Sequence, residues 1–480
     1  MKLVHQFGRF VCAGALVLLA GCMVGPNYQR PTAPIPATYK ELQSMPDGWK
    51  SATPSDEMDR GPWWSIYQDP LLDELERKVS IDNQNLKAYE AGYRQALALV
   101  SEARSNLLPT VFLPNSRQSP VAPGATRTHI DGATNSSATT VIGANWDLDL
   151  WGKIRRQVEG ERAGAQASAA QLASARLSVQ ADLATDYFEL RYEDSLERLL
   201  KDSVGAYQRT LDITREQYVA GAAAKSDVMA ALAQLQTAQA QLIAVGVSRA
   251  QYEHAIALLI GQPPAGLTVP PADLTATVPV TPVALPSTLL ERRPDIAQAE
   301  RSMQQQNAQI GVAIAAYYPD ISLSGMFGYA RTSAVVLASN KVWSSAANAS
   351  QLLADGGGRS ATVRAAHAAY EQSVAQYRQT VLTAFHDVED ALSSLRVLAQ
   401  QSDAQEAAVA SLRESLEVAL QEYQTGAVDY TAVVTAQVAA LSNEEAALQI
   451  KESRLAASVA LLKALGGGWE ASTLEAGGRS

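Results

Sequence analysis

The distribution of proline constrains this chain more than any other feature of its sequence. All 21 prolines lie at or before residue 319, and the stretches 124–262 and 320–480 contain none. A proline inside a helix costs about 3 kcal/mol, so a very long helix must exclude it. Both stretches are also rich in Ala, Gln, Glu, Leu and Arg, which favour helices. The sequence therefore predicts helices longer than those of an ordinary compact domain.

The longest of these helices is expected over residues 153–219, and a similar one over 359–424. A helix across the first range would extend about 100 Å, because each residue adds about 1.5 Å. Helices of this length are typical of coiled coils and helical bundles. A soluble helical bundle has the same periodicity, so the pattern alone leaves that alternative open.

An internal repeat of about 200 residues divides the chain into two halves. Residues 218–222 (YVAGA) resemble residues 423–427 (YQTGA), and residues 149–153 (DLWGK) resemble 355–359 (DGGGR). Solenoid repeats have periods of about 20–50 residues, so this unit is too long to be one of them. The repeat indicates two pseudo-symmetric halves of one structure.

Two segments alternate with the period of a β-strand, 140–149 in the first half and 320–329 in the second. Alternating runs of about 10 residues flanked by aromatic side chains fit the strands of membrane barrels, although a soluble hairpin with one wet face remains an alternative. The repeat predicts two further strands near 110–119 and 341–353. Four strands cannot close a barrel alone, since the smallest single-chain barrels use about eight. If the strands span a membrane, several chains must therefore share one barrel.

The N-terminus has the pattern of an export signal. A basic start precedes the apolar run Phe10–Ala20, which is too short to cross a bilayer as a helix. Residues 19–22 (LAGC) resemble the bacterial lipobox, in which cleavage leaves Cys22 as the acylated first residue. The next residue is Met23 rather than Asp, which favours the outer membrane over retention at the inner one.

Composition excludes several classes of function. The chain has 39 basic and 49 acidic residues, giving a net charge of −10 and a pI near 5.2, which argues against a nucleic-acid partner. The two cysteines and five histidines include no metal-binding or catalytic pattern. We therefore expect neither an enzyme nor a chain with a cofactor or a resident metal.

Four motifs together cover nearly the whole mature chain, and they resemble those of the TolC-type outer-membrane efflux channels. Within that family they resemble the acylated branch that serves resistance-nodulation-division pumps. The motifs are residues 22–31 (CMVGPNYQRP), 63–72 (WWSIYQDPLL), 285–296 (LPSTLLERRPDI) and 318–328 (YPDISLSGMFG).

The resemblance implies a mainly α protein with a membrane β-part. It implies a homotrimer, in which each chain gives four strands to one outer-membrane β-barrel that continues as a long periplasmic α-helical barrel. The expected domains are a signal peptide (1–21), a lipid-anchored and equatorial segment (22–70), a first efflux repeat (71–261), an equatorial linker (262–290), a second efflux repeat (291–466) and a C-terminal tail (467–480).

The function implied is that of a passive exit duct for small toxic compounds. Its partners would be a periplasmic adaptor protein, an inner-membrane pump and the lipid of the outer membrane. Two alternatives stay open: a duct for secreted proteins with the same fold, and a lipid-anchored coiled coil without a pore.

The same resemblance places a periplasmic gate at the turns near 218–228 and 423–436. The candidates are Asp227 and Asp429, with Tyr218, Tyr423 and Lys225 nearby. Threefold symmetry would bring three like carboxylates around one axis, where they repel each other and attract cations. Asp227 could equally cap the helix that follows it.

One position departs from the family's pattern. Channels of this type often carry an aspartate where this chain has Thr435. A carboxylate ring at that level is therefore in doubt, and the selectivity of the gate could differ from that of its relatives.

Overall fold

The computed structural model describes residues 23–32, 36, 39–41, 63–113, 115–118, 137–279, 293–332 and 339–467. The export signal, Cys22, residues 285–292 of the third motif and the tail after residue 467 lie outside these ranges. The chain forms two compact units. Unit 1 combines Met1–Thr32, Gly92–Ser168 and Gln298–Tyr377, and unit 2 combines Ala33–Ala91, Ala169–Ala297 and Arg378–Ser480.

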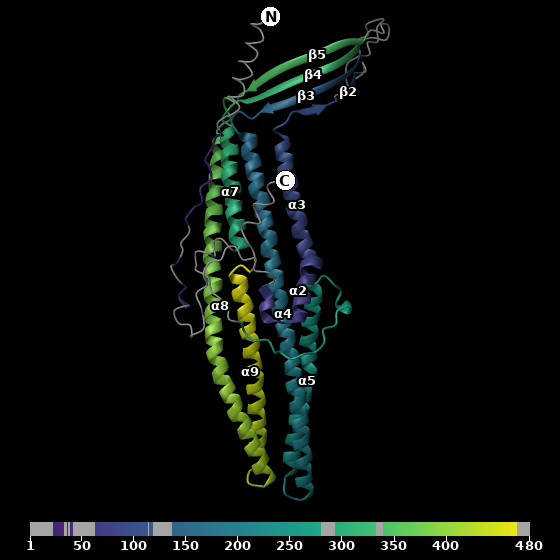
Figure 1. Cartoon of the computed structure of the whole chain (residues 1–480), viewed down its shortest axis with the longest axis vertical. Helices are drawn as coiled ribbons and strands as arrows, with labels where there is room; N and C mark the ends of the chain where they lie inside the picture. The colour runs from purple at the N-terminus through teal and green to yellow at the C-terminus, as the bar shows by residue number, and fades with distance from the viewer. Residues whose placement is uncertain are drawn as a thin grey trace. The chain divides into compact units, whose positions relative to one another are not determined.

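Two very long helices dominate the secondary structure, as the absence of proline predicts. Helix α4 spans Lys153–Val219 and α8 spans Gly358–Gln424, each with 67 residues. The other helical elements are η2 (Trp63–Tyr67), α2 (Pro70–Asp82), α3 (Gln84–Ser105), α5 (Lys225–Leu259), η3 (Pro264–Gly266), α7 (Pro294–Ala315) and α9 (Tyr430–Ala464). In Figure 1, α4 and α5 form one helical hairpin and α8 and α9 form another.

The repeat is visible in the lengths of corresponding helices. α5 and α9 both have 35 residues, and α3 and α7 both have 22. Each half therefore runs through a 22-residue helix, strands (three in the first half and two in the second), a 67-residue helix and a 35-residue helix. This confirms the two pseudo-repeated halves.

The strands form one antiparallel sheet in unit 1, with the order β1-β3-β4-β5 and with β2 also paired to β3. Figure 1 shows β3, β4 and β5 side by side. Their bounds are Thr110–Phe112 (β1), Asn115–Gln118 (β2), Ser137–Leu148 (β3), Asp320–Thr332 (β4) and Ser339–Ser350 (β5).

Two of the expected strands differ from the prediction. The strand expected over 110–119 is divided into β1 and β2, and the sequence places Pro114 between them, where its missing N–H cannot join a ladder. The strand expected over 341–353 is β5, which ends at Ser350. Within β5, Trp343 is paired with Phe327 of β4.

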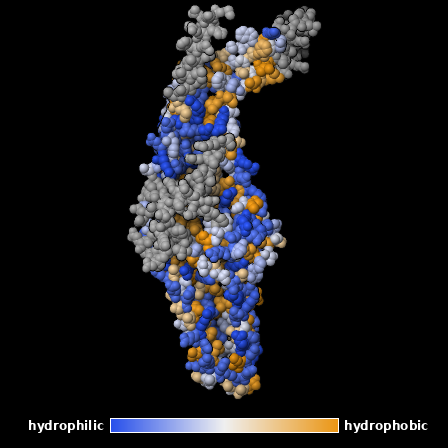
Figure 2. Space-filling view, viewed as in Figure 1, coloured by the Kyte–Doolittle hydropathy of each residue, from blue (hydrophilic) through white to orange (hydrophobic). Residues whose placement is uncertain are grey.

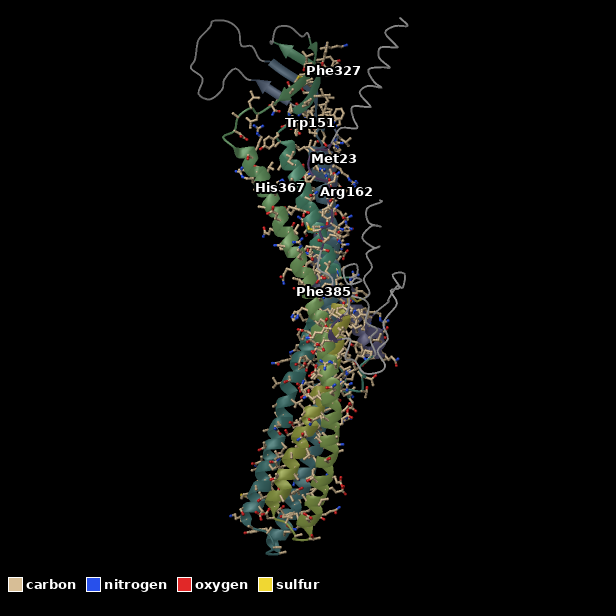
Figure 3. All side chains as sticks on the ribbon, turned by 90° about the vertical axis from the view of Figure 1, so that its left-hand side faces the viewer. Met23, Trp151, Arg162, Phe327, His367 and Phe385 are labelled. Carbon is tan, nitrogen blue, oxygen red and sulfur yellow. The ribbon has the colours of Figure 1, made fainter. Side chains whose placement is uncertain are left out.

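The N-terminal segment of unit 1 is fixed by a buried arginine. Arg156, which is 1% exposed, donates hydrogen bonds from its guanidinium to Val24 O at 3.1 Å, Gly25 O at 3.2 Å and Asn27 Oδ1 at 2.9 Å. Figure 3 shows Met23 close to Trp151, at the junction of β3 and α4. The residue that follows Cys22 is thus held beside the end of a strand.

The main core of unit 2 packs the second motif against α4 and α9. Trp63, Trp64 and Tyr67 are buried in it, and the ring of Tyr67 lies 4.8 Å from that of Phe188. The Tyr67 hydroxyl is 2.7 Å from Ser458 Oγ on α9. These contacts explain why the motif is so aromatic: large rings fill the space between helices, and their polar atoms find partners.

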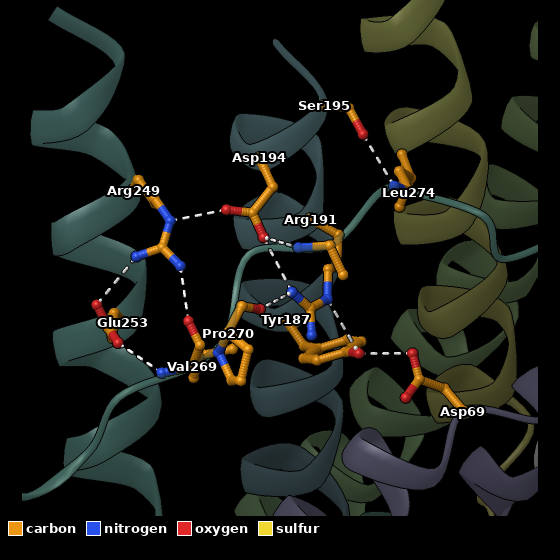
Figure 4. A network of polar contacts seen from close by, with 11 residues as sticks. Asp69, Tyr187, Arg191, Asp194, Ser195, Arg249, Glu253, Val269, Pro270 and Leu274 are labelled. Atoms are coloured by element: carbon orange, nitrogen blue, oxygen red, sulfur yellow. Dashed lines mark hydrogen bonds and ion pairs between the residues drawn. The ribbon is translucent and has the colours of Figure 1, made fainter. Parts of the chain in front are cut away.

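A polar network beside this core fastens the segment after α5 to the helices (Figure 4). Asp194 accepts hydrogen bonds from Arg191 at 2.9 Å and from Arg249 at 2.7 Å. The two arginines also donate to the backbone oxygens of Pro270 and Val269. A segment without helix or strand is thereby given fixed hydrogen-bond partners.

Candidate periplasmic gate

The turns that join the long helices to their shorter partners have the same backbone in both halves. Gly221 has φ +79° and Gly426 has φ +78°, a region that favours glycine. Gly221 N donates to Tyr218 O and Gly426 N to Tyr423 O, both at 3.0 Å. These bonds close the last turn of each long helix and reverse the chain sharply.

Both candidate aspartates make helix-capping contacts. Asp227 Oδ2 accepts from Ala224 N at 3.0 Å, and Asp227 N donates back to Ala224 O at 3.1 Å. Asp429 Oδ1 accepts from Ala432 N at 3.2 Å. Each carboxylate satisfies a backbone N–H at a helix start, which is the local role that aspartate favours.

The remaining candidates fall into exposed and buried groups. Tyr218 is 46% exposed, and Lys225 is exposed on the same turn. Thr435 is exposed on α9, where its hydroxyl donates to Thr431 O at 2.8 Å. Tyr423 is buried instead.

Tyr423 joins the two helical hairpins. Its hydroxyl donates to Thr214 Oγ1 on α4 at 3.3 Å, and its backbone oxygen accepts from Gln217 Nε2 at 3.4 Å. Its ring lies 5.5 Å from that of Tyr430. Burial raises the pKa of the Tyr423 hydroxyl, so it remains protonated and available as a donor.

A second set of contacts between the hairpins was not predicted from the sequence. Gln437 Nε2 on α9 donates to Thr210 Oγ1 at 3.1 Å, and Tyr207 OH donates to Gln437 O at 3.4 Å. Tyr207, Thr210 and Thr214 recur at spacings of three and four, so they share one face of α4. That spacing is the signal that could have found them. We call Tyr207, Thr210, Thr214, Tyr423 and Gln437 the inter-hairpin contact.

No group of three His, Cys, Asp or Glu residues in the described part of the chain is placed to hold a metal ion. Among the described helices, α5 has the length and composition that could cross a membrane. Of an apolar stretch of 18 residues in this helix, 28% is buried inside the chain. Its large exposed apolar residues are Met229, Ile243, Val247 and Leu258.

Comparison with known proteins places this geometry in a family. The sequence matches the outer membrane efflux protein family over residues 77–262 and 285–467. The chain is 27% identical to the cation efflux system protein CusC of Escherichia coli over 459 residues, covering 94% of this chain and 97% of CusC. It is 27% identical to the toluene efflux pump outer membrane protein TtgC of Pseudomonas putida, covering 96% of this chain and 95% of TtgC.

A solved structure supports the same assignment. The outer-membrane channel OprN superposes with a TM-score of 0.82 at 30% identity, covering 93% of this chain and all of that one. The chain therefore belongs to the outer membrane efflux protein family. The resemblance to TolC-type channels, the fold class, the outer-membrane location with extension into the periplasm and the assignment as a channel rather than an enzyme are confirmed.

Proposed function

We propose that the chain forms the outer-membrane exit duct of a tripartite efflux system. It passively conducts small toxic compounds that an inner-membrane pump delivers through a periplasmic adaptor. The observation that carries this is the sheet of unit 1, in which β1 and β5 each pair on one side only among the described residues. A bilayer tolerates strands only in a closed barrel, so the edges must pair with further copies.

Three copies close the barrel, with four strand positions from each chain. One feature supports assembly around the helices as well. The apolar residues of α5 are exposed in the single chain, Ile243 to 77% and Leu258 to 74%. Exposed apolar residues of this size on a long helix are typical of a surface that another helix covers.

Family membership also weighs against the two alternatives. A lipid-anchored coiled coil without a pore has no need of a sheet with an exposed apolar face. The relatives named above are components of cation and toluene efflux systems, so export of small toxic compounds is favoured over secretion of proteins.

Lipidation of Cys22 is the second part of the proposal. The contacts of Arg156 to Val24, Gly25 and Asn27 support it, because they hold the start of the mature chain beside the end of β3. An acyl chain on the preceding residue would then enter the same membrane leaflet that the strands approach. Labelled palmitate should be incorporated into the wild type and not into Cys22→Ala.

The gate is the third part. The inter-hairpin contact and the capped turns of Asp227 and Asp429 are the candidate elements that hold the periplasmic end narrow, with Tyr218, Lys225 and Thr435 exposed nearby. Opening would require the Tyr423–Thr214 and Gln437–Thr210 hydrogen bonds to separate. Each such hydrogen bond contributes about 1 kcal/mol to the stability of the closed form, so contacts with an adaptor can replace it.

Purified protein reconstituted in planar bilayers tests the proposal. We expect stepwise conductance from the wild type and a higher open fraction from Tyr423→Phe, which lacks the hydroxyl that reaches Thr214. Tyr89→Phe, which removes the hydroxyl of an exposed tyrosine on α3, is the matched control and should behave as the wild type. Absence of any conductance step in a properly assembled trimer would refute the duct.

A further inference from the structure

The two faces of the sheet differ in composition: one is apolar and the other is mostly polar or small. Ile142, Phe327 and Trp343 are paired with one another, are between 55% and 75% exposed, and lie on one face. Hydrophobic residues are accordingly visible over the strands in Figure 2, and Figure 3 shows Phe327 on the sheet. Since lipid requires an apolar surface, this is the outer face of the barrel.

The other face lines the lumen, and most of it is polar or small. Neighbouring strands place Asp147, Ser322 and Asn348 in one row, and Asn145, Ser324 and Ala346 in the next. These rows lie towards the end of β3 that leads into α4 and towards the start of β4 that follows α7. They have the composition expected of a water-filled channel.

Phe112 interrupts this polar lining. It is the register partner of Gly143, whose side-chain direction is that of the lumen face. A Cβ added to Gly143 would lie 2.6 Å from Cζ and 2.7 Å from Cε2 of Phe112, so the phenyl ring occupies the space that any larger residue at 143 would need. Phe112 is nevertheless 48% exposed. One side of its ring packs on the glycine and the other side is open.

The neighbours of Phe112 make its level of the lumen apolar. Gly143 pairs on its other side with Met326, which is 45% exposed and therefore also open to the lumen, and Ser344 on β5 is the single polar member of this row. The following row contains Val141, Gly328 and Val342. Along the lumen face, polar rows thus give way to a level of aromatic and thioether side chains.

We propose that Phe112, seated on Gly143 and flanked by Met326, forms an apolar constriction inside the β-barrel. This rests on the proposed trimeric duct, since threefold symmetry places three phenyl rings and three thioethers at one level. A narrow apolar level disfavours water and ions, and it offers a contact surface to apolar and aromatic solutes. Phe112 is therefore a residue that determines which solutes pass the outer end of the duct.

A purely structural reading of the same pair predicts something different. An aromatic ring that covers a glycine on a neighbouring strand stabilises strand pairing. In that case replacing Phe112 would lower stability and leave conduction through assembled channels unchanged. Measurements on assembled trimers separate the two readings.

Single-channel recording in planar bilayers is the first test. Relative to the wild type, Phe112→Ala should raise the unitary conductance and Phe112→Trp should reduce it. The matched controls are Phe327→Ala and Phe327→Trp, on the lipid face of the adjoining strand β4, and they should conduct like the wild type. Wild-type conductance from both Phe112 variants, in channels that open normally, would overturn the constriction.

Thiol labelling gives a second readout that does not require a change of stability. Cys22 is the only cysteine after removal of the signal, and acylation blocks its thiol. Phe112→Cys should react with a membrane-impermeant cationic thiol reagent and lose current on modification, whereas Phe327→Cys should not react. Unreactive Phe112→Cys in a conducting trimer would contradict the lumen position. A wild type that never conducts would instead contradict the duct itself.

Discussion

At the scale of single residues, unit 2 contains acidic groups in two contrasting environments. Asp194 is almost completely buried and accepts hydrogen bonds from two arginines. Glu76 is also fully buried, but neither of its carboxylate oxygens has a hydrogen-bond partner in the described part of the chain. Asp194 is thus paired with two guanidinium groups, whereas Glu76 is stabilised as a neutral acid, because burial without a cation disfavours charge.

Replacing Asp194 should reveal the cost of leaving two arginines without their shared partner. We expect Asp194→Ala to lower the free energy of unfolding by about 3–5 kcal/mol, since breaking a buried ion pair leaves uncompensated charge. Asp212→Ala, which removes the exposed Asp212–Arg215 pair at 3.7 Å on the same helix, should cost less than about 1 kcal/mol. Chemical denaturation of both variants in detergent is the measurement. Equal losses of unfolding free energy in the two variants would show that the buried network contributes no more than an exposed ion pair.

Glu76 should make stability depend on pH. Burial raises its pKa from 4.5 to about 9, with the neighbouring Asp73 adding to the rise. The folded state therefore holds this proton at pH values where the unfolded chain has lost it. The contribution of this bound proton to the free energy of unfolding is complete below about pH 4.5 and is lost as the pH rises through about 9. Thermal unfolding between these limits should show falling stability.

The variant Glu76→Gln should flatten that profile, because a neutral amide cannot ionise. Glu74→Gln on the same helix is the control, since Glu74 is exposed and its pKa is lowered by Lys78 rather than raised. A profile that remains equally steep in Glu76→Gln would assign the pH dependence to other groups. Other buried carboxyls that could account for it are those of Glu189, Glu193 and Glu452, whose pKa values are also raised by burial.

At the scale of elements, each helical hairpin depends on one glycine. Gly221 and Gly426 have positive φ, yet an added Cβ would meet nothing within 4 Å at either position. Glycine is therefore required for its backbone conformation and not for space. The two turns are repeated because both halves must reverse a long helix in the same way.

Two alanine substitutions distinguish a requirement for the backbone conformation of glycine from a requirement for space. Gly426→Ala should destabilise the protein by about 1 kcal/mol, because a Cβ disfavours the left-handed region. Gly246→Ala, inside α5 and also with no atom within 4 Å of the added Cβ, should stabilise it by about 0.5–1 kcal/mol. Thermal unfolding of the two variants should shift in opposite directions. Shifts of the same sign would contradict the role of backbone conformation.

At the scale of the whole molecule, assembly completes what the single chain leaves open. The sheet has two edges to pair, and α5 has apolar residues to cover. We expect further copies of the same chain to meet both requirements. The assembly is therefore part of the folding of the barrel, since strands with unpaired edges are unstable in lipid.

A charge on the exposed apolar face of α5 should weaken the trimer. Ile243 is 77% exposed in the single chain, so Ile243→Glu should leave the helices of each chain folded while desolvation of the carboxylate opposes assembly. Gln241→Glu, two residues away and already polar, is the control. Size-exclusion chromatography with light scattering in detergent would give the oligomeric state. Unaltered trimers of Ile243→Glu would place this face outside the interface.

The long helices, the duplicated organisation and, for strands that span a membrane, the need for several chains can be read from the sequence, because they follow from composition, spacing and repetition along the chain. Proline is excluded from a helix beyond its first turn, and strand alternation has a period of two whatever the strands contact. The tertiary structure alone decided which distant residues meet. Asp194 with Arg249, Tyr423 with Thr214, and Phe112 over Gly143 are pairs that depend on register and packing between elements. No local pattern encodes that register, since a shift of one residue reverses the face of every side chain in a strand.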